Sequence, residues 1–155
     1  MNPMNRRHFI LASGAAICAG VCGCAGTGGP LGEAWTGPTR FDLGPIAAIR
    51  PGVDTHWAEI GGFFVVRDQS RIAAVSSICS HRRCPLTFKT REYICDCHGS
   101  KFTPSGIVQL GPAVRSLPHF GILLDAAGQV IVNRAAIFEE ARWADPGAWI
   151  EAGKS

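Results

Sequence analysis

Two short segments rich in cysteine and histidine constrain this chain more than any other feature. The first runs from Cys79 to Cys84 and the second from Cys95 to Ser100. Together they hold four of the seven cysteines and two of the five histidines. Thiolates and imidazoles at such short spacing can bind a metal from two loops, and cysteines can also pair with each other. Three chemistries are therefore open: a zinc site, an iron–sulfur cluster, or plain disulfides.

The six side chains fit these chemistries differently. The candidate ligands are one cysteine and one histidine from each segment: Cys79, His81, Cys95 and His98. These four satisfy a structural zinc ion, but they leave Cys84 and Cys97 without a role. Plain disulfides use the cysteines and leave both histidines idle. A 2Fe–2S cluster with mixed ligation takes two thiolates and two imidazoles.

The two segments resemble the two cluster-binding loops of Rieske proteins. Gly99 and Ser100 follow the second histidine as they do in that family. Gly111-Pro112-Ala113, with Leu117-Pro118 after it, resembles the proline-rich loop that covers the third side of a Rieske cluster. The likeness extends over roughly residues 60–133.

The resemblance implies the cofactor and its ligands. It implies a 2Fe–2S cluster held by the four candidate ligands, and a disulfide between Cys84 and Cys97 that braces the loops. Rieske centres of dioxygenases and their ferredoxins generally lack this cysteine pair. The pair therefore indicates the disulfide-bearing branch, which includes cytochrome bc complexes and the small subunits of arsenite oxidases. Members of this branch transfer single electrons and perform no bond chemistry alone.

Residues around the ligands bear on the redox potential. Ser100 matches a family serine whose hydroxyl donates to a bridging sulfide. Phe102 stands where high-potential members carry a tyrosine whose hydroxyl donates to a cysteine sulfur. A hydrogen bond to a charged group contributes about 1.5–3 kcal/mol, so its loss lowers a one-electron potential by about 60–130 mV. We expect an intermediate potential, below that of quinol-oxidising members.

The fold is expected to be all-β, an antiparallel Rieske-like sandwich that carries a cluster-binding subdomain of two loops. Nineteen glycines, ten prolines and low charge indicate a turn-rich β protein. Hairpins are predicted on both sides of Asp68-Gln69-Ser70 and of Ala126-Ala127-Gly128. Edge strands are predicted over Arg40 to Leu43 and Trp57 to Ile60.

A short C-terminal helix is predicted over Ala135 to Arg142, before Asp145-Pro146-Gly147. Trp143 and Trp149 follow it, and either pack back on the sheet or dock on a partner or membrane. His56 and His119 lie outside the two loops and are expected to be ordinary structural histidines.

The N-terminal region has the features of an export leader. Asn5 to Ile10 resembles a twin-arginine signal, which suits a protein exported with its cluster in place. Three fates of the leader are open: acylation at Cys24, retention as a membrane anchor, or cleavage and release. The expected organisation is a leader (1–25), a Gly/Pro linker (26–38), a Rieske domain (39–133) and a C-terminal helix and tail (134–155).

Charge and redox state define the expected surroundings. A net charge of +3 gives no reason to expect nucleic-acid binding. A disulfide beside a cluster implies an oxidising compartment, so we expect an exported, periplasmic, membrane-tethered protein. Its expected partner is a cytochrome b- or c-type protein or a molybdenum subunit, with a quinol as a further candidate. A stand-alone periplasmic electron carrier is the remaining alternative. The basic residues near the loops could steer an acidic partner or form only a solvated face.

Overall fold

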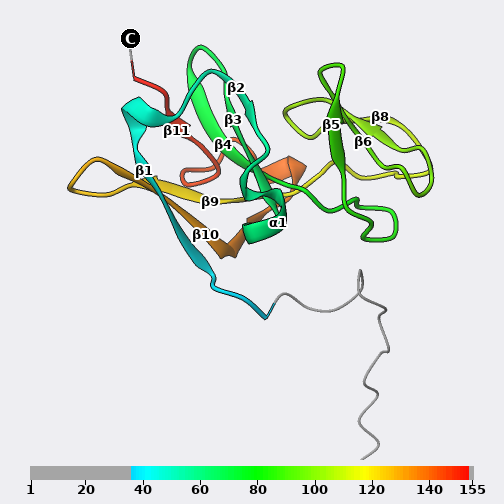
Figure 1. Ribbon diagram of the computed structural model, residues 1–155, viewed down its shortest axis with the longest axis horizontal. Coiled ribbons are helices and arrows are strands. Elements are labelled where there is room, and N and C mark those ends of the chain that lie inside the picture. The colour runs from blue at the N-terminus through cyan, green and yellow to red at the C-terminus, as the bar shows by residue number, and fades with distance from the viewer. Residues whose placement is uncertain (1–35, 154–155) are drawn as a thin grey trace, which may run out of the picture.

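Two antiparallel sheets, one of seven strands and one of four, form the part of the chain that the structure describes, residues 36–153 (Figure 1). The structure is a computed structural model. The expected leader with Cys24, and the expected linker up to residue 35, lie outside the described residues. The all-β antiparallel fold class is confirmed.

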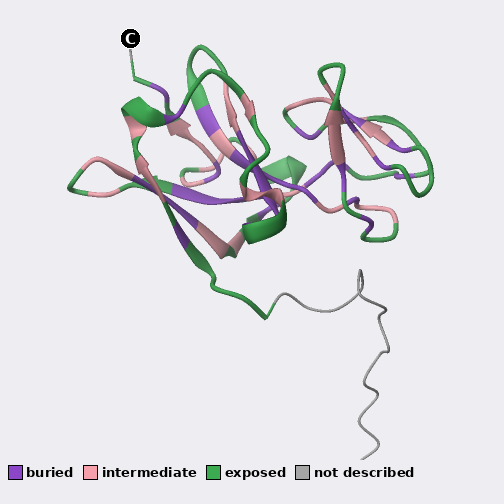
Figure 2. Cartoon of the chain, in the orientation of Figure 1, coloured by how far each residue is buried: buried purple, intermediate pink, exposed green. Residues whose placement is uncertain are grey.

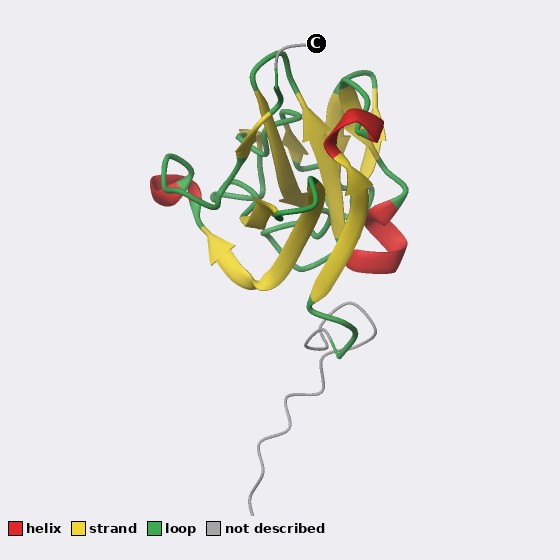
Figure 3. Ribbon diagram, turned by 90° about the vertical axis from the view of Figure 1, so that its left-hand side faces the viewer, coloured by secondary structure: helices red, strands yellow, loops and turns green. Residues whose placement is uncertain are grey.

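The large sheet contains β1 (Arg40–Pro45), β2 (Gly52–Asp54), β3 (Phe63–Arg67), β4 (Arg71–Ser76), β9 (His119–Leu124), β10 (Gln129–Phe138) and β11 (Ile150–Glu151). Its order is β1-β10-β9-β4-β3-β2, and β11 pairs with the start of β4. The small sheet contains β5 (Thr87–Lys89), β6 (Glu92–Ile94), β7 (Lys101–Phe102) and β8 (Val108–Leu110), in that order. The helical elements are η1 (Ile46–Ala48), α1 (Trp57–Gly61) and η2 (Glu140–Arg142). Figure 3 shows them around the strands of the large sheet.

The β3–β4 hairpin joins the two halves of the molecule. Successive side chains of a strand point to opposite faces, and here both faces are apolar. Phe63 packs into the core of the large sheet, whereas Phe64 packs into a second core that contains the cysteines of the two loops. The ring of Phe64 stacks on Tyr93 of β6 at 4.5 Å between centroids. The small sheet is therefore held against the large one by buried aromatic contact.

The small sheet is an insertion between β4 and β9, and it forms the separate lobe on the right of Figure 1. Buried residues concentrate in β3, β4, β9 and β10 (Figure 2). Both predicted hairpins are present. The β3–β4 hairpin includes the pair Phe63–Ser76, and the β9–β10 hairpin includes the pair Val130–Leu124. This arrangement positions a loop-rich lobe at one end of a rigid base.

The predicted strand over Trp57 to Ile60 is wrong, because these residues form α1. The Asp54 carboxylate accepts the backbone N–H of His56 at 2.8 Å and turns the chain into the helix. Gly62 ends the helix in the left-handed conformation, with φ of 71°, and its N–H donates to Ala58. The ring of Trp57 then stacks parallel to Phe63. The glycine after the segment was the helix-end signal.

The predicted helix over Ala135 to Arg142 is corrected to a strand followed by a short 3-10 helix. Ala135 to Phe138 continue β10, and Ile137 pairs with Phe120 after a bulge that begins at Asn133. Only Glu140–Arg142 are helical. Pairing with β9 outweighs the helix preference of the alanines.

The two C-terminal tryptophans pack back on the sheet. Trp143 stacks on His119 with 4.2 Å between ring centroids, and its indole N–H donates to the carbonyl of Phe138. The guanidinium of Arg71 lies 3.9 Å from the centre of the Trp149 ring. Between residues 36 and 153, no helix is long and apolar enough to cross a membrane.

Candidate metal centre

The two loops that carry the candidate ligands are built on the same hydrogen-bond frame. In the first loop, the N–H of Cys79 donates to the carbonyl of Cys84, and the N–H of Arg83 donates back to Cys79. In the second loop, Cys95 bonds to Ser100 and Gly99 bonds back to Cys95 in the same way. Each loop therefore turns back on its first cysteine and presents the residues between to one side.

The fifth residue of each loop is in the left-handed backbone region. Gly99 has a φ of 80° and Arg83 a φ of 59°. Glycine adopts this conformation without steric cost, whereas arginine does so at some cost. The first loop thus keeps an arginine where the second has the residue that the turn favours.

A disulfide between Cys84 and Cys97 ties the two loops together, with 6.5 Å between the Cα atoms. The predicted pairing is therefore present. The other two loop cysteines, Cys79 and Cys95, are free and only 1% and 0% exposed. Two thiols thus remain on the inner side of the braced loops.

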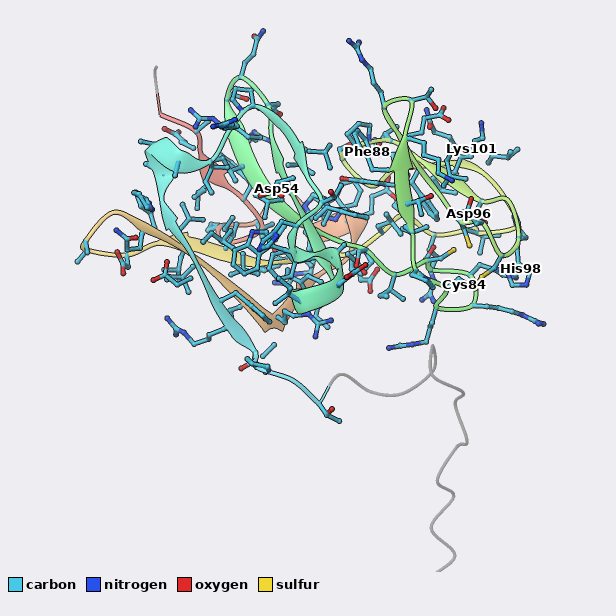
Figure 4. The ribbon with its side chains drawn as sticks, in the orientation of Figure 1. Asp54, Cys84, Phe88, Asp96, His98 and Lys101 are labelled. Carbon is cyan, nitrogen blue, oxygen red and sulfur yellow. A yellow bond between two sulfur atoms is a disulfide. The ribbon has the colours of Figure 1, made fainter. Side chains whose placement is uncertain are left out.

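The two loop histidines lie next to each other at the outer side. The rings of His81 and His98 have centroids 4.9 Å apart and are nearly perpendicular. His98 is exposed, at the same end of the lobe as Cys84 (Figure 4). Nδ1 of His81 is buried and has no hydrogen-bond partner. A buried ring nitrogen without a partner is costly in a protein interior, and a metal ligand is a common reason for one.

The segment from Gly111 to Arg115 forms a third wall beside the loops. Its Gly111–Pro112 bond is cis. The N–H of Ala113 donates to the hydroxyl of Ser100 at 3.0 Å, and Ser100 is completely buried. The hydroxyl of Ser80 donates to the carbonyl of Arg115 at 2.6 Å. One serine from each loop therefore holds this segment in place.

Apolar burial surrounds the inner side of the site. Phe102, opposite Tyr93 in the β6–β7 pair, is fully buried in the same cluster as Cys79 and Cys95. The Tyr93 hydroxyl donates away from the loops to the carbonyl of Pro104, and burial raises its pKa. Phe102 has no hydroxyl, so it packs against this side of the site and donates no hydrogen bond.

Burial raises the pKa of the Cys79 thiol, and the neighbouring Cys95 sulfur acts in the same direction. The backbone N–H groups of His81 and Arg82 act in the opposite direction, since they bond to the Cys79 sulfur. A bound metal would displace the thiol proton. The first loop therefore supplies both a thiol ligand and the backbone donors that stabilise its anionic form.

The donor set fits a 2Fe–2S cluster with mixed ligation. Two free buried thiols and two adjacent imidazoles, one with a buried and unpartnered ring nitrogen, match what such a cluster requires. A compact sulfur group is also formed by Cys84, Cys95 and Cys97, whose ligand atoms lie within 4.8 Å of one another. Two of its members are paired in the disulfide, so only Cys95 is a free ligand there.

The remaining candidate residues lie elsewhere. His56 precedes α1 and His119 is buried in β9, so neither reaches the loops. Cys24 lies outside the described residues. The sequence reasoning missed Ser80 and Arg115, whose contact joins residues 35 positions apart. No local pattern signals such a contact.

Comparison with known proteins agrees with this geometry. The family model of the Rieske [2Fe-2S] domain matches residues 43–121, which are 79 of the 155 residues. The chloroplastic iron–sulfur subunit of the Arabidopsis thaliana cytochrome b6-f complex is 32% identical over 73 residues, 44% of this chain and 32% of the relative. The corresponding subunit of Gloeobacter violaceus is 32% identical over 82 residues, 46% of this chain and 44% of the relative. The chain thus spans less than half the length of these two relatives.

A solved structure is also similar, that of the plasma membrane Rieske protein PetC3 from Synechocystis PCC 6803. It has 22% sequence identity and a TM-score of 0.40, and the match covers 60% of this chain and 98% of that one. The family model covers half of the chain, and the brace between the two loops is formed. The chain therefore belongs to the Rieske family, in its disulfide-bearing branch, and its cofactor is a Rieske-type 2Fe–2S cluster.

Proposed function

We propose that this protein is an exported, membrane-tethered one-electron carrier whose cluster is held by Cys79, His81, Cys95 and His98. The ligand assignment rests on the arrangement of the thiols and imidazoles in the two loops. Two unpaired buried thiols lie on its inner side, and two adjacent imidazoles lie on its outer side. The disulfide removes the other two loop cysteines from the set of possible ligands.

A 2Fe–2S cluster held by two thiolates and two imidazoles supplies reversible one-electron transfer at a higher potential than an all-cysteine cluster. Cys79 and Cys95 act as buried anionic ligands that solvent does not reach. His98 is exposed, so its ring can be approached by a partner. Ser100 accepts from Ala113 and keeps its own proton for donation.

The proposed partner is a cytochrome-type protein. Two of the relatives are subunits of cytochrome b6-f complexes, which supports this choice over a molybdenum subunit. Phe102 lacks the hydroxyl of high-potential members, so we place this protein below the quinol-oxidising members in potential. The proposed export route is the twin-arginine pathway, and the proposed tether is the N-terminal segment with Cys24.

Ligand substitution tests the assignment. Each of the variants Cys79→Ser, His81→Gln, Cys95→Ser and His98→Gln is expected to lose bound iron and the visible absorption of the cluster. His56→Gln is the matched control, because His56 is exposed and far along the chain from the loops. A ligand variant that keeps full iron and an unchanged spectrum contradicts the assignment of that residue.

Fractionation of cells tests the location. The proposal expects the protein in the membrane fraction of the cell envelope, and expects Arg6→Lys combined with Arg7→Lys to keep it in the cytosol. Release of Cys24→Ser into the soluble periplasm would support acylation, whereas retention would support an uncleaved anchor. Cytosolic location of the unaltered protein contradicts the export proposal.

A further inference from the structure

The basic side chains of the small lobe fall into two groups that differ in their pairing. Residues 76–118 contain six lysines and arginines but only two carboxylates, Glu92 and Asp96. Both carboxylates are engaged. Lys89 lies 3.5 Å from Asp96, and Lys101 lies 3.2 Å from Glu92. These pairs compensate the two lysines on the side of the lobe built by β5, β6 and β7, where Figure 4 shows Asp96 and Lys101. Arg91, in the β5–β6 turn, is the one basic residue of that side that forms no ion pair within the described residues.

The other group lies beside the metal centre and is not neutralised. Arg82 and Arg83 follow His81 in the first loop, and both are exposed. Arg115 is also exposed, and its carbonyl is bonded to Ser80 of the same loop. Within the described residues, these three guanidinium groups form no ion pair. Arg83 is also close enough to Arg134 to contribute, after burial, to the lowered pKa of Arg134.

Exposed apolar side chains accompany these arginines. Val114 is 89% exposed directly beside Arg115, and Leu110 is 54% exposed at the end of β8. Val114 follows Ala113, whose N–H is fixed by Ser100, so the valine is held outward by the wall of the site. An apolar centre bordered by cations is the usual composition of a transient docking surface.

We propose that Arg82, Arg83, Arg115 and Val114 form the surface on which the electron-transfer partner docks, and that the partner is a protein with an acidic face. This inference rests on the proposed function and adds the chemistry and position of the partner's contact. Three uncompensated cations attract an acidic surface over a Debye length and raise the association rate. Their position beside His81 brings that surface to the exposed side of the metal centre. The β5–β7 side has a single uncompensated cation, Arg91, and therefore attracts an acidic surface less.

The test measures electron transfer from the reduced full-length holoprotein to two soluble c-type cytochromes, one with an acidic face and one with a lysine-rich face. Each transfer takes one electron from the protein and reduces one ferric haem to the ferrous form. Stopped-flow rates are recorded from about 10 mM to about 1 M salt, which shortens the Debye length from about 30 Å to about 3 Å. The rate with the acidic cytochrome is expected to fall with salt, and the rate with the basic one to rise.

Charge reversal locates the effect. Arg115→Glu lies outside both ligand loops and is expected to slow reaction with the acidic cytochrome about 3- to 10-fold at about 0.1 M salt, where the Debye length is about 10 Å. Arg91→Glu makes the same charge change in the β5–β6 turn and, at the same salt, is expected to change the rate less than about 2-fold. Equal effects of the two variants, or equal salt dependence with both cytochromes, overturn the proposal.

Two further readouts separate other outcomes. Iron content and midpoint potential are measured first for each variant. An unaltered protein without the cluster refutes the proposed function, whereas an intact cluster with no effect of Arg115→Glu refutes only the docking surface. Cosedimentation with phosphatidylglycerol vesicles tests a lipid surface. If Arg115→Glu abolishes binding to the vesicles but does not slow the reaction with the acidic cytochrome, the surface binds lipid and the proposal is overturned.

Discussion

Ser100→Ala should change both the stability and the redox potential, because one hydroxyl serves two purposes. Its oxygen accepts the N–H of Ala113, and both residues are buried, at 0% and 5% exposed. Without that oxygen the Ala113 N–H is left unpaired, which costs about 1–3 kcal/mol of unfolding free energy. The hydroxyl proton is free for donation to the cluster. Its loss should lower the midpoint potential by up to about 60–130 mV.

Ser116→Ala is the matched control for this experiment. Ser116 is also buried, at 4% exposed, and its hydroxyl accepts the N–H of Val108 at 3.2 Å. It lies outside both ligand loops, so its loss should destabilise the fold by about the same amount or less without moving the potential. Denaturant unfolding and a redox titration of the holoprotein are measured for both variants. Equal potential shifts in the two, or none in Ser100→Ala, would refute a hydroxyl donor at Ser100.

Three further changes have defined outcomes. Phe102→Tyr should raise the midpoint by about 60–130 mV in a redox titration, because it adds a hydroxyl beside the buried thiols. Cys84→Ser should lower the unfolding free energy by about 3 kcal/mol in denaturant titrations, since it opens the link between residues 13 positions apart. His119→Gln should flatten the pH dependence of stability below neutral pH. Burial lowers the pKa of His119 in the folded protein. On acidification the unfolded chain is therefore protonated at this histidine before the folded one, and stability falls as the pH drops through the unfolded-state pKa of about 6.5.

Each of these outcomes can fail in a distinct way. An unchanged midpoint in Phe102→Tyr would mean that the ring position only packs. An unchanged unfolding midpoint in Cys84→Ser would mean that the disulfide constrains nothing in the unfolded chain. For His119, the charged groups that line the same cavity are Asp68 and Arg71, and its Nε2–H donates to Ser105. A pH profile of His119→Gln as steep as that of the unaltered protein would assign the effect to another group.

The sequence predicted those features of the site that depend on local spacing. Each ligand loop closes within six residues, so the Cys–His segments themselves define the turns. The β3–β4 and β9–β10 hairpins were also predictable, because a turn separates two runs of β-branched and apolar residues.

Features that depend on distant partners could not be predicted in this way. The strand nature of Ala135 to Phe138 comes from pairing with β9. The contact between Ser80 and Arg115 depends on how the third wall folds over the loops. The helix at Trp57 was predictable in principle, because Gly62 directly follows it, but its apolar residues also suit an edge strand. The packing of the small sheet against the large one also depends on a distant contact, because Phe64 of β3 joins the core of the two loops while Phe63 joins the core of the large sheet.

The most direct test of the account is the electron paramagnetic resonance spectrum of the anaerobically purified and reduced protein, recorded through a redox titration. Ligation by Cys79, His81, Cys95 and His98 predicts a rhombic signal whose average g is clearly below that of all-cysteine ferredoxins, with a midpoint below that of quinol-oxidising members. A protein that gives no such signal, and that contains one zinc ion per chain and no iron, would contradict the account.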